Sequence, residues 1–184
     1  MPRGKMRTKK EKPEFDQQIL DLARVTRVTK GGKQLSFRAT VVIGDRRGRV
    51  GLGIAKGKDV QMATEKAVNQ AKKRVTVIPI QRETIPHRVE AKFKAGRVLI
   101  KPAPKGSGII AGGAMRTVLE LAGVPNASGK IIGRTHNQVT NVKATLKALS
   151  FLRAGKRKSQ TAESPAGKEG EKLAESVTEA PTGA

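Results

Sequence analysis

Residues 105–124 have the sequence KGSGIIAGGAMRTVLELAGV, in which a glycine-rich turn leads into an apolar helix. Prolines precede the turn, and Gly123 followed by Pro125 ends the helix. The polar residues of the helix fall on one narrow strip: Arg116, Thr117 and Glu120. Because the rest of the helix surface is apolar, we expect the helix to be largely buried and the second half of the chain to be built around it.

A glycine turn that opens a helix can also bind phosphate, since free backbone amides and the positive end of the helix dipole point into the turn. Nucleotide hydrolysis also requires a phosphate-binding lysine motif and an acid that holds Mg²⁺. There is no GxxxxGK[ST] motif, and no Asp or Glu lies between Glu90 and Glu120 to hold Mg²⁺. We therefore rank helix packing first, contact with polynucleotide phosphates second and nucleotide hydrolysis third. The candidate phosphate contacts are Lys105, Gly106, Ser107, Gly108 and Arg116.

The charge of the chain is its strongest indication of a partner. It contains 38 Lys and Arg against 15 Asp and Glu, with a net charge of +23 and a pI near 11.1. A polycation of this kind is typical of proteins that bind nucleic acid. The sequence has no long apolar run, no apolar N-terminal leader and no cysteine. We expect a cytoplasmic protein with no membrane partner, no disulfide and no thiolate metal site.

Aromatic side chains are scarce, with four Phe and neither Trp nor Tyr. Proteins that bind single-stranded RNA stack its bases on aromatic rings, at about 1–3 kcal/mol per base. This chain cannot build such a platform, so we expect it to contact phosphates and the shape of folded RNA. His87 has no carboxylate or nucleophile pattern beside it, which argues against a general base. We predict no enzyme activity, cofactor, metal or small-molecule substrate.

The first half predicts a small domain over residues 15–78, after a basic, disordered arm at residues 1–14. Leu22, Val25 and Val28 lead into the sequence KGGK at residues 30–33, where Gly-Gly indicates a hairpin, and apolar residues then recur at every second position. The expected core face of its second strand consists of Phe37, Ala39, Val41 and Ile43, opposite Ser36, Arg38 and Thr40.

A second hairpin is predicted at residues 45–48, followed by a strand at residues 49–55. Its residues are expected to alternate, with Val50, Leu52 and Ile54 facing inward and Gly51 and Gly53 outward. A helix after residue 59 then buries Val60, Ala63, Ala67, Val68 and Ala71 at helical spacing. Three antiparallel strands with one helix resemble the double-stranded-RNA-binding fold without its leading helix.

Basic residues gather in the loops of this first domain. A single charged turn is usually just solvated, but three of them on one small domain favour an RNA-binding face. The candidate RNA contacts are Arg24, Arg27, Lys30, Gly31, Gly32 and Lys33 around the first hairpin, Arg46, Arg47 and Arg49 at the second, and Lys56 and Lys58 before the helix.

Residues 79–152 predict a second small domain, begun by the apolar run at residues 75–80, with two helices on a mostly antiparallel sheet in an α/β sandwich-like arrangement. Strands are expected at residues 85–93, 97–101 and 130–133, and the last helix at about residues 137–152. That helix should bury Val139, Val142, Leu146 and Leu149 and expose Lys143 and Lys147. Arg134 is the last candidate RNA contact. Residues 153–184 predict a disordered tail. Together, the predicted elements of both halves indicate an α+β protein with two small domains.

Two sets of motifs carry a family resemblance. In the second half these are the run GIIAGGAMRTVLELAGV at residues 108–124, with PAP at residues 102–104 and TIPH at residues 84–87 before it. In the first half they are KGGK, Phe37, and GD at residues 44–45 with GRVGLG at residues 48–53. In this order they resemble the bacterial small-subunit ribosomal protein five family over roughly residues 15–152. Lys105, where that family often has an acidic residue, and the longer entry to the last helix at residues 135–138 depart from its pattern.

The resemblance implies a structural subunit that binds 16S ribosomal RNA, with residues 29–33 near the neck between head and body. It also implies contacts with ribosomal proteins four and eight, a place beside the messenger RNA entry path, and an influence on translational accuracy. Two alternatives stay open at this point. One is a free protein that binds any RNA duplex through its first domain, and the other is a small-molecule kinase, because a group of such kinases shares the fold implied for the second domain.

Overall fold

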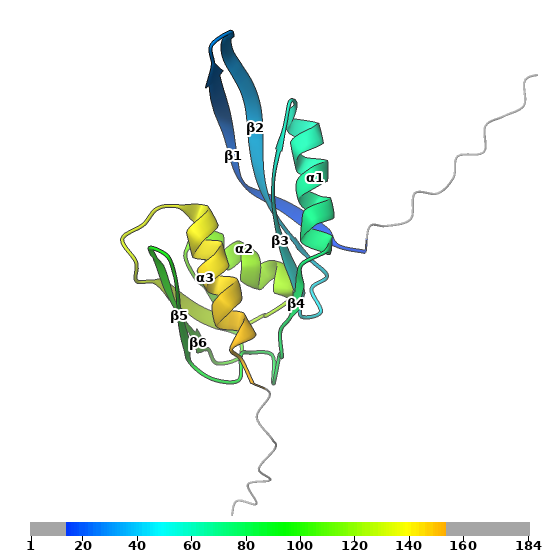
Figure 1. Cartoon of the computed structure of the whole chain (residues 1–184). Helices are drawn as coiled ribbons and strands as arrows, with labels where there is room; N and C mark the ends of the chain where they lie inside the picture. The colour runs from blue at the N-terminus through cyan, green and yellow to red at the C-terminus, as the bar shows by residue number, and fades with distance from the viewer. Residues whose placement is uncertain (1–13, 154–184) are drawn as a thin grey trace, which may run out of the picture.

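Two four-stranded sheets and three helices make up the computed structural model, which describes residues 14–153 (Figure 1). The predicted arm and tail therefore lie outside the described residues, apart from Glu14 and Arg153. The mixed α+β class and the division into two halves are confirmed.

The first sheet has the strand order β1-β2-β3-β4 and is antiparallel throughout. Its elements are β1 (Asp16–Thr29), β2 (Gly32–Gly44), β3 (Arg49–Gly57), α1 (Val60–Lys72) and β4 (Val75–Val77). The prediction of three strands is wrong by one. The segment expected to begin the second domain instead returns along β3, where Val75 pairs with Gly51 and Val77 with Arg49. It thereby supplies hydrogen-bond partners to the free edge of β3.

Helix α1 packs on the face of β3 that carries Gly51 and Gly53, while Val50 and Leu52 are buried on the other face as predicted, so only the prediction for the glycines is wrong. Gly51 and Gly53 are buried against α1, not directed outward. A Cβ atom at Gly53 would overlap the carbonyl oxygen of Ala67, and one at Gly51 would lie 2.6 Å from the carbonyl oxygen of Ala71. Glycine facing alanine lets the helix backbone lie directly on the strand.

The second sheet has the order β5-β6-β8-β7, with only β7 and β8 parallel to each other. Its elements are β5 (Val89–Phe93), β6 (Gly96–Pro102), β7 (Ile109–Ile110), α2 (Gly113–Ala122), β8 (Ala127–Ile131) and α3 (Gln138–Ser150). The strand expected at residues 85–93 begins four residues later, and the strand expected at residues 130–133 is shifted to β8. Strand β7 was not predicted, because two residues are too few to show a period.

Helices α2 and α3 agree closely with their predicted extents. The apolar side chains of α2 are buried as expected, but Thr117 is also buried, 8% exposed, and its hydroxyl donates to the carbonyl oxygen of Gly113. The prediction that Thr117 lies on an exposed polar strip is therefore wrong. Helix α3 starts after Asn137, whose side-chain oxygen accepts from the amide of Val139, so the unusual sequence at residues 135–138 forms an N-cap.

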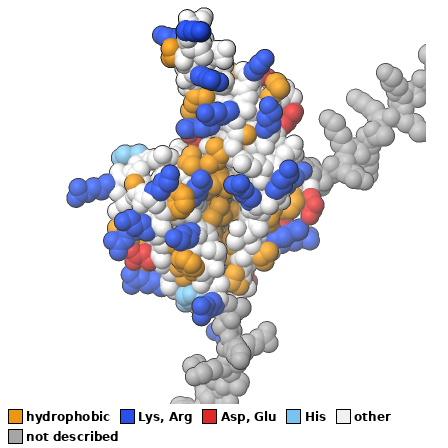
Figure 2. Space-filling view, viewed as in Figure 1, with side chains coloured by type: hydrophobic (Ala, Val, Ile, Leu, Met, Phe, Trp, Pro, Cys, Tyr) orange, Lys and Arg blue, Asp and Glu red, His pale blue; other side chains and the backbone are white. Residues whose placement is uncertain are grey.

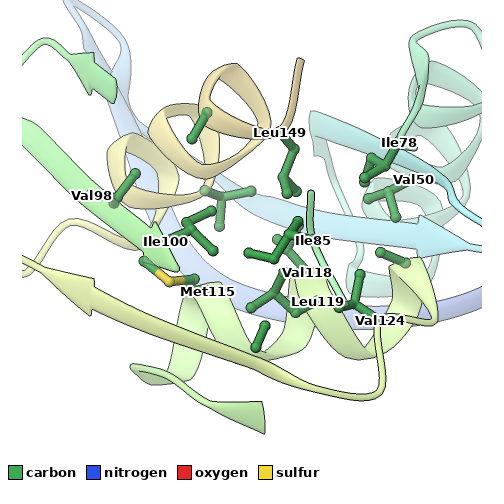
Figure 3. Packing of buried hydrophobic residues seen from close by; sticks show 14 of the residues in the cluster. Val50, Ile78, Ile85, Val98, Ile100, Met115, Val118, Leu119, Val124 and Leu149 are labelled. Carbon is green, nitrogen blue, oxygen red and sulfur yellow. The ribbon is translucent and has the colours of Figure 1, made fainter. Parts of the chain in front are cut away.

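One hydrophobic core joins the two halves. Val50 and Leu52 from the first sheet pack in the same cluster as Leu119 of α2, Val124 just after it and Leu149 of α3 (Figure 3). Thr40 was expected on a solvent face, yet it is fully buried, because the second half covers that face of the sheet. A separate, smaller cluster lies between the sheet and α1: Ala39, Val41, Ile43, Ala63, Ala67 and Ala71.

The halves are also joined through their backbones. The turn between β2 and β3 donates from the amides of Arg46 and Gly48 to the carbonyl oxygens of Leu121 and Ala122, at 3.0 and 2.8 Å. Both carbonyls belong to the last turn of α2, where backbone carbonyl oxygens have no partner amide within the helix. Gly123 follows with φ 77°, and a Cβ atom there would overlap the carbonyl oxygen of Arg46. The contact therefore requires glycine at position 123.

We predict that Gly123→Ala lowers the free energy of unfolding by about 2 kcal/mol or more, because alanine is strained at this φ and its methyl group meets the turn. Gly113→Ala in the first turn of the same helix is the matched control, since no atom lies within 4 Å of a Cβ atom there. Urea unfolding of both variants, followed by circular dichroism, measures the difference. Equal stability of the two variants would contradict the role given to Gly123.

Candidate nucleic-acid interface

The hairpin of β1 and β2 projects beyond the rest of the described residues (Figure 1), and it carries exposed cations at its end. Residues 32–35 of β2 are exposed, residues 36–38 are half-buried and Ala39 is the first buried residue, so about 13 Å of this strand is exposed at the end of the hairpin. The turn itself is Lys30 and Gly31, and the Thr29 hydroxyl donates across it to the carbonyl oxygen of Gly32. Arg24, Arg27, Lys30 and Lys33 are all exposed, and none forms an ion pair within residues 14–153.

The second predicted group, at the turn between β2 and β3, has a different environment. Arg49 pairs with Asp45 at 2.6 Å and with Glu14 at 3.0 Å, and its guanidinium lies 5.2 Å from the ring centroid of Phe15. Arg46 pairs with Asp16 at 2.9 Å. Of the three arginines, only Arg47 is exposed and without an ionic partner in the described part of the chain. Arg49 stabilises the fold, and its RNA contact stays a prediction, as does that of Arg46.

Asp45 is the acid around which this turn is organised. Its side chain is only 4% exposed, and one carboxylate oxygen accepts from the amides of Arg47 and Arg49 at 2.8 and 3.0 Å. Burial opposes ionisation of the carboxyl group, but the Arg49 guanidinium and the two amides outweigh burial and lower the pKa of Asp45 to about 2. The hydrogen bonds of the Arg49 guanidinium to the carboxylates of Asp45 and Glu14 raise the pKa of Arg49. Both groups are therefore charged at neutral pH.

The glycine turn before α2 is less open to phosphate than its sequence indicates. Gly106 and Gly108 have φ values of 83° and 69°, as a tight glycine turn requires. However, the amide of Gly108 donates to the side-chain oxygen of Asn126, and the amide of Ser107 donates to the carbonyl oxygen of Pro104. Two of the candidate phosphate donors thus already have partners within the protein. Sequence analysis missed Asn126, the buried residue that accepts the hydrogen bond from Gly108. Its position between Pro125 and β8 was the only signal in the sequence.

The remaining candidates are exposed side chains in separate places. Lys56 and Lys58 lie before α1, and Arg134 lies between β8 and α3. Lys105 pairs with Glu83 at 3.4 Å, and Arg116 pairs with Glu120 one helical turn away. Because α2 has ten residues, about 15 Å of helix separates the glycine turn at its start from the Arg46 turn at its end. The structure does not bring the predicted residues into one patch.

A hollow between the two halves carries cations that were not among the candidates. It has a volume of about 430 Å³ and is lined by Leu52, Ile54, Gln70, Arg74, Lys143 and Leu146. Figure 2 shows hydrophobic side chains in the middle of this face, with Lys and Arg side chains on both sides. The Lys143 ammonium also lies 5.4 Å from the ring centroid of Phe93. The sequence predicts Lys143 to be exposed on α3, whereas in the structure it is half-buried at this hollow.

Acids within residues 14–153 are few and mostly engaged. Between residues 15 and 152 there are 26 Lys and Arg against eight Asp and Glu, a net charge of +18. Of the acids described, only Asp59 and Glu65 are outside an ion pair. Most cations of this region are thus unpaired and available to a polyanion. No described helix has the length and apolar composition to cross a membrane, and in the described region no three His, Asp or Glu residues group as metal ligands would.

Two family models match this chain. The model described as "Ribosomal protein S5, N-terminal domain" matches residues 15–79, and "Ribosomal protein S5, C-terminal domain" matches residues 91–163. The small ribosomal subunit protein uS5 of Trichormus variabilis is 47% identical over 148 residues, covering 80% of this chain and 84% of its own length. That of Synechococcus elongatus is 46% identical over 160 residues, covering 86% and 88%. The uS5c protein of Spinacia oleracea is 46% identical over 150 residues, and the chain spans about half, 48%, of its length.

We predict that Asp45→Asn destabilises the protein at pH 7 and that this difference disappears in acid. The folded-state pKa of about 2 lies below the ordinary value of about 3.9, so the ionised carboxylate stabilises the fold above pH 4. This contribution is lost as the pH falls from about 5 toward 2. Urea unfolding of both proteins at pH 7, 5, 4 and 3 measures the difference in their free energy of unfolding. A difference that stays constant over this range would contradict the lowered pKa of Asp45.

The matched control for this experiment is Asp59→Asn, because the Asp59 side chain has no cap hydrogen bond to α1 and no ion pair within the described residues. We expect it to unfold like the unaltered chain at each pH.

Proposed function

The chain belongs to the ribosomal protein S5 family, whose members are structural, non-enzymatic components of the small ribosomal subunit, and on this premise we propose that it binds 16S ribosomal RNA through phosphate and shape contacts. The observation that carries the proposal is the projecting hairpin of β1 and β2, with four exposed cations that have no ionic partner among residues 14–153.

The distribution of aromatic side chains supports phosphate contact over base stacking. The rings of Phe15, Phe93 and Phe151 each lie beneath a cation, from Arg49, Lys143 and Lys147. The fourth ring, Phe37, packs beside the core under α1. Each of the four rings is thus already in contact with a cation or with the core, which favours phosphate contact over base stacking.

We propose further that the protein stabilises the head of the small subunit relative to its body and contributes to translational accuracy. The support is mechanical: the hairpin belongs to one half, the exposed candidate Arg134 to the other, and the shared core with the contact between residues 46 and 121 fixes their separation. A protein built in this way can hold two RNA segments at a set distance. Its proposed neighbours are ribosomal proteins four and eight and the messenger RNA entry path.

The two alternatives gain no support. A small-molecule kinase conflicts with the non-enzymatic family, and the amides of Ser107 and Gly108 are already bonded. A free duplex-binding protein that acts through its first half alone would have to expose Val42, Val50 and Leu52, which the second half buries. Burying such side chains is worth about 1.5–3 kcal/mol each, so the first half is a poor independent unit.

A binding titration of the full chain with 16S ribosomal RNA tests the proposed function. We expect the affinity to fall on the order of 10³- to 10⁵-fold between 50 and 200 mM salt if six to ten phosphates are contacted. We expect the chain to prefer this RNA to a generic duplex of equal length. It should also co-sediment with small subunits after a moderate salt wash. A chain that ignores 16S RNA even at low salt would refute the proposal.

The hairpin variant Arg27→Ala/Lys30→Ala/Lys33→Ala should bind 16S RNA more weakly, with a salt slope reduced by about one for each phosphate that the variant no longer neutralises. Its matched control is the α1 variant Lys66→Ala/Lys72→Ala/Lys73→Ala, which removes the same charge from exposed positions on a helix to which we assign no RNA contact. If both variants bind equally weakly, general electrostatic attraction explains the binding and the hairpin has no special role.

A further inference from the structure

One face of the second sheet is not covered by any other part of residues 14–153. Helices α2 and α3 pack on the other face, where Val89, Ala91, Val98, Ile100 and Ala127 are buried. Because successive side chains of a strand point to opposite faces, the residues between these point away from both helices. The sheet is therefore one layer of a two-layer arrangement whose outer surface has no partner within the described residues.

The outer surface is mostly cationic; we call it the open sheet face. It consists of Glu90 and Lys92 on β5, Arg97, Leu99 and Lys101 on β6, Ser128 and Lys130 on β8, and Ile110 on β7. The strand register places these residues side by side: Lys92 opposite Arg97, Leu99 opposite Lys130, and Lys101 opposite Ser128.

The single acid of the open sheet face is already engaged, because Glu90 pairs with Arg97. Lys92, Lys101 and Lys130 are exposed and form no ion pair within residues 14–153. The lysines come from three adjacent strands, and the sheet fixes their positions. Cations held without counter-charges on a fixed surface repel one another, and an anionic partner relieves that repulsion.

The chemistry of the open sheet face fits RNA better than protein. The cores of protein interfaces are rich in aromatic and apolar side chains and poor in lysine. Here the apolar groups are Leu99, which is half-buried among charged neighbours, and Ile110 at the edge, and no aromatic residue is present. Arg97 and Lys101 lie about 13 Å apart along β6, a span that carries several phosphates on a nucleic-acid duplex.

We propose that the open sheet face of β5, β6 and β8 is a second RNA-binding surface, where Lys92, Lys101 and Lys130 contact the sugar–phosphate backbone of a folded RNA. None of the three is among the candidates that the sequence indicated. The proposal rests on the proposed function, because it assumes that RNA is the partner. It adds a surface on the second half that is separate from both the hairpin and the glycine turn.

The variant Lys92→Ala/Lys101→Ala/Lys130→Ala tests the surface in the full chain. All three side chains are exposed, so the fold should be retained, as an unchanged unfolding curve will show. In titrations with 16S ribosomal RNA between 50 and 200 mM salt, we expect the salt slope to fall by up to about three and the affinity at 150 mM to drop at least tenfold. The α1 variant, with the same loss of charge, should bind within about twofold of the unaltered chain.

The outcomes separate this inference from the proposed function. If the unaltered chain does not bind 16S RNA, the proposed function itself fails. If the unaltered chain binds and the hairpin variant is impaired, but the Lys92, Lys101 and Lys130 variant matches the α1 variant, the open sheet face is not an RNA surface and the proposed function survives.

A photo-crosslinking amino acid at position 99, in the middle of the open sheet face, identifies the occupant directly. The labelled full chain is incorporated into reconstituted small subunits and irradiated, and the products are separated into RNA and protein adducts. Crosslinks to ribosomal RNA are the expected result. Crosslinks to another ribosomal protein, or none above those from the same group placed at position 72 on α1, would overturn the proposal.

Discussion

The structure depends on one backbone contact, in which the turn between β2 and β3 closes the end of α2. Two amides of that turn bond the last carbonyl oxygens of the helix, and Gly44 and Gly123 permit the approach. At Gly44, for example, a Cβ atom would overlap the carbonyl oxygen of Leu121. Since the contact sets the first sheet against α2, it determines which strand face the second half covers. The shared core around Val50, Leu119 and Leu149 follows from it (Figure 3).

That arrangement explains how a small protein can present charge at fixed, distant points. Helix α1 covers the face of the first sheet that carries Gly51 and Gly53, and the second half covers the face that carries Val50 and Leu52. Strands β1 and β2 continue beyond both layers. Their ends remain exposed, and with them the cations of the hairpin. The open sheet face lies on the second half, beyond the layer formed by α2 and α3. A shared core between these regions keeps their separation constant, which a flexible linker between two domains would not do.

Sequence reasoning found the elements with strong local signals. The glycine turn, α2, the first hairpin and the spacing of α1 follow from glycine positions and from periods of 2 or 3.6 residues. It could not show what covers each face of β3, because aliphatic residues alternating with glycine indicate a strand without showing which neighbour lies on each side. It also could not distinguish Arg49, held by Asp45 and Glu14, from Arg47, which pairs with no acid of the described region, since such partners are set by tertiary structure. Asn126 was missed for the same reason.

The positions of the acids explain which cations stabilise the fold and which remain without an ionic partner in the described region, where a polyanion can contact them. Where an acid is buried or held by backbone amides, as at Asp45, it orders a turn and engages its arginine. Few acids remain elsewhere in the described region, so the hairpin and the open sheet face keep their positive charge. In the free chain that charge is a source of repulsion, whereas a bound polyanion converts it into attraction, and binding of the folded state alone stabilises that state. The surplus of cations therefore lowers the stability of the isolated chain and would raise that of the proposed RNA complex, so that the same charges link folding to the proposed binding.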